Sequence, residues 1–159
     1  MKDILPDADA INFGEVPEQV NELLQRGVIA HRNDRAKADE LFREALSIAP
    51  RELATYYCLY KIHTYMGNLD TARDMALQGM AEAARQAGWD QSPEKWPAQS
   101  SAVDGPARFA LFTFKALSFI ELKSGHKDVA LDHLRLLASL DPQGSVGWPV
   151  IAALAEGVT

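Results

Sequence analysis

Apolar residues recur at helical spacing along most of the chain, and short polar or glycine-containing breaks separate the runs. Around residue 60, Tyr56, Leu59, Ile62 and His63 fall on one face of a predicted helix. Gly67 follows this helix, at the place where a left-handed residue commonly ends one. The pattern predicts an all-α protein built from pairs of helices.

Three stretches share the same order of turn, small and bulky residues. Ala38, Ala72 and Ala130 occupy the same place in them. Their sequence numbers differ by 34 and then by 58, and 58 is 34 plus an insertion of 24. A second set in the same register is aromatic and consists of Tyr56, Phe114 and Trp148. A fixed period of this length is typical of proteins built from stacked structural repeats.

This order of residues resembles the tetratricopeptide repeat (TPR) family, whose period is about 34 residues. The resemblance covers roughly residues 17–87 and 107–156. It implies a right-handed superhelix of three helix-turn-helix hairpins plus a C-terminal capping helix. Stacked hairpins of this kind bury a continuous core and curve around a concave face.

We expect an N-terminal arm over residues 1–16 and a single TPR domain over 17–156. The predicted hairpins cover about 17–51, 52–87 and 107–143, and the capping helix covers 146–156, with Pro149 tolerable only in its first turn. Three prolines predict an inserted loop over 88–106. Its Trp89 and Trp96 have two interpretations. They form a lid over the groove, or they fill the gap between the second and third hairpins.

The resemblance implies that the first helix of each hairpin lines a concave, partner-binding groove. The residues at the matching positions are mainly aromatic or cationic: His31, Tyr57, Lys61, Thr64, Tyr65, Phe112, Lys115, Phe119 and Lys123, with Leu23, Gly27, Ala30 and Leu122 beside them. Such groups suit a peptide with apolar anchors and some acidic residues. The alternative is that the phenylalanines pack against the loop or the capping helix and that the lysines are ordinary solvated charges.

Composition narrows the class of partner. The chain of 159 residues has 16 Lys and Arg against 22 Asp and Glu, a net charge of −6, which disfavours nucleic-acid binding. The N-terminus carries acids where a signal peptide needs cations, and the most apolar stretch, 109–122, is too short and too charged to span a membrane. We therefore expect a cytoplasmic protein with no membrane partner.

The chemistry of common active sites is missing from the sequence. No phosphate-binding glycine loop or His-Glu-x-x-His motif occurs, and the four histidines are far apart. The single cysteine, Cys58, excludes an intrachain disulfide and has no identifiable base, which favours a packed structural thiol. Glu40 and Glu44 belong to a solvated helix face on which Asp39 and Arg43 can pair. We expect no catalytic residues, no metal and no cofactor.

The leading hypothesis is therefore a non-catalytic TPR adaptor or assembly helper that binds a peptide or protein in its groove. One alternative is a chaperone like those of bacterial type III secretion, which the three repeats, the size and the acidity resemble. Another is a helper of nitrogenase maturation, because the run 56–65 resembles small TPR proteins found beside bacterial nitrogen-fixation genes. An enzyme would need a reactive Cys58 or His63. A homodimer is a further possibility, since the end hairpins of short repeat arrays often expose apolar faces.

Overall fold

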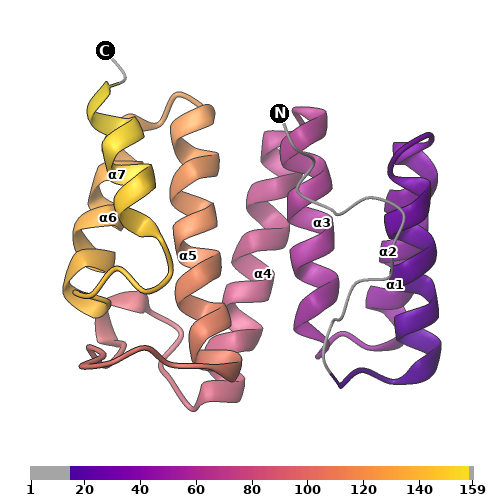
Figure 1. Ribbon diagram of the computed structural model, residues 1–159, viewed down its shortest axis with the longest axis horizontal. Coiled ribbons are helices and arrows are strands. Elements are labelled where there is room, and N and C mark those ends of the chain that lie inside the picture. Colours follow the sequence, from indigo (N-terminus) through magenta and orange to yellow (C-terminus); the bar gives the residue numbers. More distant parts are fainter. Residues whose placement is uncertain (1–14, 158–159) are drawn as a thin grey trace. The chain divides into compact units, whose positions relative to one another are not determined.

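The computed structural model describes residues 15–157, which are mainly α-helical and contain no strand (Figure 1). The all-α prediction is confirmed, while residues 1–14 of the predicted arm lie outside the described residues. The elements are α1 (Glu18–Ala30), α2 (Arg35–Ile48), α3 (Leu53–Met66), α4 (Leu69–Ala87), the 3-10 turn η1 (Pro93–Lys95), α5 (Gly105–Lys123), α6 (Lys127–Leu140) and α7 (Trp148–Gly157).

The helix boundaries reproduce the register of the sequence. Helices α2, α4 and α6 begin at Arg35, Leu69 and Lys127, which have the same spacing as the three recurring alanines. Ala38, Ala72 and Ala130 stand one turn further on, and each is fully buried. A small buried residue at this place lets a neighbouring helix approach closely, which explains why all three stretches carry alanine there.

Glycine ends α3, α4 and α5 in the same way. Gly67, Gly88 and Gly125 have positive φ angles of 79°, 75° and 85°. In each case the next residue donates its backbone N–H to a carbonyl five residues earlier: Asn68 to His63, Trp89 to Ala84 and His126 to Glu121. This is the Schellman pattern, which needs a left-handed residue that glycine adopts at little cost. The expected role of Gly67 is confirmed.

The chain divides into two compact units, with the boundary inside α4 between Met75 and Ala76. In unit 1, α1 and α2 form a hairpin and α3 packs against α2. Its fully buried apolar side chains include Leu24, Phe42, Leu59 and Ile62. The expectation of a single domain over 17–156 stays a prediction.

Gly27 is the point of closest approach in the first hairpin. A Cβ atom at this position would lie 2.3 Å from Cε1 of Phe42, whose side chain is fully buried on α2. Gly27 therefore faces the second helix of its own hairpin, and the expectation that it borders a partner-binding groove is wrong. The physical reason is steric, because only a residue without a side chain leaves room for the Phe42 ring.

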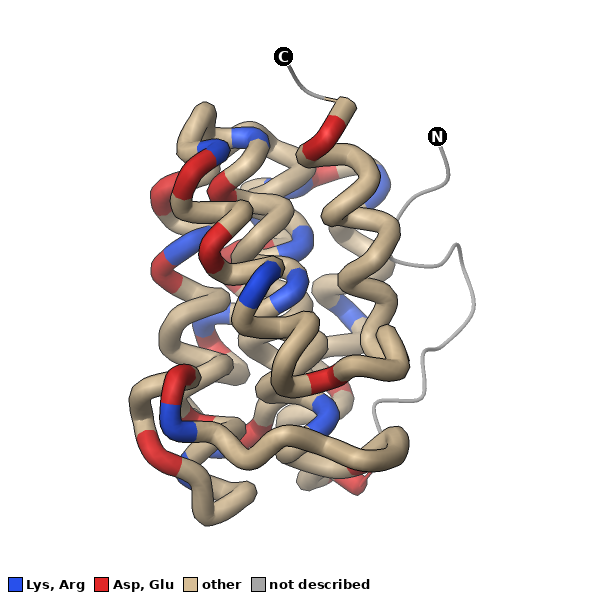
Figure 2. Tube along the Cα trace, turned by 90° about the vertical axis from the view of Figure 1, so that its left-hand side faces the viewer, with Lys and Arg blue, Asp and Glu red and all other residues tan. Residues whose placement is uncertain are grey.

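In unit 2, α5 and α6 form a hairpin and α7 packs against both helices (Figure 1). Charged positions follow one another along α6, whereas α7 carries only Glu156, near its C-terminal end (Figure 2). Helix α5 begins at Gly105, two residues before the predicted third hairpin, because Pro106 fits the first turn of a helix, where no N–H partner is needed. Pro149 occupies the first turn of α7, as predicted.

Candidate functional site

In unit 1 the expected partner-binding residues of α3 lie on a half-buried face of that helix. Tyr57, Lys61, Thr64 and Tyr65 are all half-buried, and Lys61 Nζ stands 5.4 Å from the centre of the Tyr57 ring. A cation over a ring face at this distance is attracted to its π-electrons. The Thr64 hydroxyl donates to the Tyr60 carbonyl of the same helix at 2.6 Å. The face therefore presents aromatic rings and one ammonium group.

Burial changes the proton affinity of this face. Loss of water raises the pKa of the Tyr57 hydroxyl, with smaller contributions from Cys58 and Tyr65, and it lowers the pKa of the Lys61 ammonium. Both shifts have the same cause, since a low-dielectric environment disfavours the charged form of each group. An anionic group from a partner would reduce the cost of keeping Lys61 charged.

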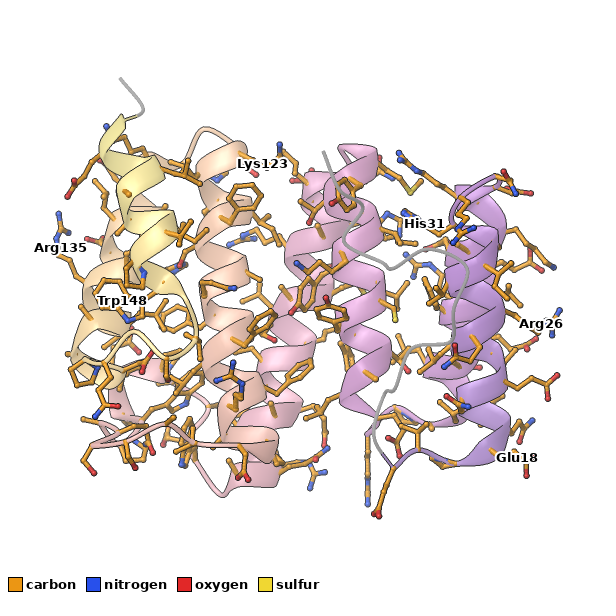
Figure 3. All side chains as sticks on the ribbon, in the orientation of Figure 1. Glu18, Arg26, His31, Lys123, Arg135 and Trp148 are labelled. Atoms are coloured by element: carbon orange, nitrogen blue, oxygen red, sulfur yellow. The ribbon has the colours of Figure 1, made fainter. Side chains whose placement is uncertain are left out.

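His31 differs from the other expected binding residues because it is only 2% exposed. It caps the C-terminal end of α1, on the side of the hairpin toward α3 (Figure 3), and its ring centre lies 6.2 Å from that of Tyr65. This contact joins the C-terminal ends of α1 and α3. His31 therefore contributes to packing in unit 1 and offers a partner little surface.

In unit 2 the expected residues of α5 form a continuous row, which we call the α5 stripe: Phe112, Lys115, Phe119 and Lys123. Positions three and four apart share one face of a helix, so the row follows the helix axis. Lys115 Nζ lies 4.0 Å from the centre of the Phe112 ring and Lys123 Nζ lies 5.6 Å from the centre of the Phe119 ring. Lys123 is exposed at the C-terminal end of α5 (Figure 3). The stripe thus alternates aromatic and cationic groups.

The segment between α4 and α5 packs onto the helices of its own unit, unit 2, through its tryptophans. Trp96 is 5% exposed, and its ring centre lies 5.3 Å from that of Trp89 and 5.8 Å from that of Phe114. Trp96 Nε1 donates to the Asp90 carbonyl, and the backbone N–H of Gln99 donates to the carbonyl of Leu140 at the end of α6. Trp96 is accordingly a core residue of unit 2, with Trp89 half-buried beside it.

Sequence reasoning missed one polar network in unit 1. Asn68 Nδ2 donates to His63 Nδ1 at 3.2 Å, and this leaves His63 Nε2 as the donor to Asp39 Oδ1 at 2.6 Å. Asp39 also accepts from Arg43, as the helix spacing predicted. The signal available beforehand was a histidine on an apolar face, because a buried imidazole needs partners. Its partner could not be identified, since Asp39 belongs to the preceding helix and is distant in sequence.

We expect replacement of His63 by leucine to lower the free energy of unfolding by about 2 kcal/mol, because it removes the buried donor of Asp39 and an acceptor of Asn68. Urea denaturation followed by circular dichroism measures this change. The matched control is Arg43→Ala, which removes the exposed partner of the same carboxylate and should cost less than about 0.5 kcal/mol. Equal losses in the two variants would show that the buried network contributes nothing beyond a surface ion pair.

Cys58 is fully buried on α3, and burial raises the pKa of its thiol. A protonated, inaccessible thiol is a poor nucleophile.

Among residues 15–157 no group of three or more His, Cys, Asp and Glu side chains is placed to hold a metal ion. None of the described helices is both long and apolar enough to cross a membrane.

Comparison of the chain with models of known protein families, with curated proteins and with solved structures finds no match.

Proposed function

We propose that this chain is a non-catalytic, TPR-type protein-interaction module that binds an acidic peptide segment with apolar anchors. The observation that carries the proposal is the repeated pairing of a lysine with an aromatic ring on first helices of the repeat. One pair is Tyr57 with Lys61 on α3. The two other pairs lie in the α5 stripe and are Phe112 with Lys115 and Phe119 with Lys123. An adaptor or assembly helper of the cytoplasm is the role that such a module would fill.

The chemistry of these pairs favours an acidic partner. Each ammonium group lies over a ring, so its position is restricted before a partner arrives, and less conformational entropy is lost on binding. A carboxylate from the partner can approach the ammonium while an apolar side chain packs beside the ring. Because the chain as a whole has a net charge of −6, an acidic segment is attracted only where lysines gather, on α3 in unit 1 and on α5 in unit 2.

A random peptide library of about 12 residues, displayed on phage and selected against the full chain, tests the proposal. We expect the selected peptides to combine Asp or Glu with Phe, Leu or Trp. Their affinity, measured by fluorescence anisotropy, should fall at least tenfold when Tyr57, Lys115 and Phe119 are replaced together by alanine. The affinity should also fall with rising salt concentration, because screening weakens the contact between opposite charges.

The matched control replaces three exposed residues of second helices, Ile48, Val129 and Arg135, by alanine. We expect this variant to bind the selected peptides like the unchanged protein, and circular dichroism should confirm that both triple variants keep their helix content. Selection of basic peptides, or equal losses of affinity in the two variants, would contradict the proposed function.

A further inference from the structure

Helix α7 exposes an apolar surface, which we call the α7 outer face: Pro149, Val150, Ala153 and Leu154. The side chains of Val150 and Leu154 are 65% and 47% exposed, one helical turn apart. The opposite side of α7 faces the interior of unit 2, where Ala155 is fully buried. The last helix of a repeat array normally presents a polar outer face to water, so this apolar surface calls for a cover.

The equivalent positions of the other first helices show that this surface is normally buried. Counting back from Val150 by 34, 58 and 34 residues, the repeat period with its one insertion, reaches Ala116, Cys58 and Leu24 in turn. The same steps from Leu154 reach Ile120, Ile62 and Val28. Of these six residues on α5, α3 and α1, five are buried and Ala116 is half-buried. Two positions that are buried, or in one case half-buried, in the other first helices are therefore exposed in α7.

A helix is the element that fits this surface. The first helices α1 and α5 each pack against a second helix that follows after a short turn and runs antiparallel, α2 and α6 respectively. No helix follows α7 among the described residues. An antiparallel helix laid on the α7 outer face would complete the hairpin pattern of the repeat.

A second copy of α7 meets this requirement better than α1 of a second copy. The exposed side of α1 carries Glu18, Glu22 and Arg26, and Glu18 and Arg26 extend away from the helix (Figure 3). Burying these charges against an apolar surface would be costly. The α7 outer face has no charge, so two chains of net charge −6 can meet there with little local repulsion (Figure 2).

Symmetry and side-chain size agree with this pairing. A two-fold axis across α7 sets two copies of the helix antiparallel, the direction found in both hairpins. The outer side of α7 carries the large Val150 and Leu154 together with the small Ala153. A large side chain of one copy can then lie over a small residue of the other, as Phe42 lies over Gly27 in the first hairpin.

We propose that the α7 outer face joins two copies of this chain about a two-fold axis, with their α7 helices antiparallel. The pairing is independent of the peptide-binding function proposed above. One pair of short helices buries less surface than a standard stable interface, so the dimer should be reversible and concentration-dependent.

Sedimentation equilibrium of the full chain, over about 5–500 µM, tests the proposal. We expect the mean mass to rise from that of a monomer toward that of a dimer. A Val150→Glu/Leu154→Glu variant should stay monomeric throughout, whereas Val129→Glu, at a 40% exposed position on α6, should dimerise like the unchanged chain. A monomer at every concentration, or a dimer unaffected by the double substitution, would overturn the proposal.

Cross-linking gives a second measurement that needs no destabilising change. In an Ala153→Cys variant oxidised with diamide, we expect a disulfide-linked dimer, because the proposed axis brings the two α7 helices together at this position. Val129→Cys is the control, and buried Cys58 should not react. Equal cross-linking of the two variants would overturn the proposal. So would loss of the dimer on deleting residues 2–14, since it would assign the contact to the N-terminal segment.

Discussion

Replacing Gly27 with valine is expected to lower the free energy of unfolding by about 3 kcal/mol. A Cβ atom at this position would lie within 2.3–2.8 Å of three atoms of the Phe42 ring, and that ring is fully buried. Alanine should cost less, about 1–2 kcal/mol, because its better helix propensity offsets part of the clash. Guanidinium denaturation followed by circular dichroism measures both values.

Two companion variants isolate the cause. Gly157→Ala adds the same methyl group in α7, where nothing lies within 4 Å of the new atom, and it should leave stability unchanged or slightly raised. Phe42→Leu in the Gly27→Ala background should recover part of the loss, so that the double variant is more stable than the sum of the two single changes predicts. Strict additivity of the two changes would refute a steric contact between these residues.

Replacing Asp141 with alanine is expected to cost about 3 kcal/mol. This buried carboxylate, at the end of α6, accepts hydrogen bonds from the backbone N–H and hydroxyl of Ser145 and from the backbone N–H of Val146. The Asp141 carbonyl also accepts from Trp148 Nε1 at 2.7 Å. Alanine leaves two backbone donors near the start of α7 without their acceptor, and a buried donor in that state is costly.

The consequence should be local as well as global. Hydrogen exchange followed by mass spectrometry should show faster exchange over residues 145–157 in Asp141→Ala than in the unchanged chain, because the connection that positions α7 is loosened. The control is Asp132→Ala, which removes only an exposed ion pair with Arg135 and should cost less than about 0.5 kcal/mol. If exchange over residues 145–157 were the same in both variants as in the unchanged chain, Asp141 would not fix this connection.

Much of the fold follows from local pattern. The break at Gly67 predicted a helix end, because glycine adopts the left-handed conformation at little cost, and this residue has it. The spacing of Ala38, Ala72 and Ala130 predicted three equivalent second helices, and the helices that carry these residues begin at the same spacing. Each of these signals depends on a few neighbouring residues, so the sequence carries it without reference to the rest of the fold.

The candidate site was only partly predictable. The pairs within the α5 stripe follow from helix geometry, since residues three and four apart on one helix are neighbours. The buried surroundings of His31 and Gly27 could not be predicted. Resemblance to a repeat assigns each residue a position in the pattern, but it does not say which side chain of another helix packs against it. Gly27 packs against the ring of Phe42, which belongs to the other helix of the hairpin.

By itself, the sequence determined that this chain is helical, that a helix ends before Gly67, and which residues recur in register. Only the tertiary structure decided which distant groups meet: Asp39 with His63, Trp96 with Phe114, and the turn after α6 with the Asp141 carboxylate. It also decided that Val150 and Leu154 of α7 stay exposed while five of their six counterparts in the other first helices are buried. The physical reason is that helix formation depends on neighbours within one or two turns, whereas burial and polar pairing depend on which helices pack together.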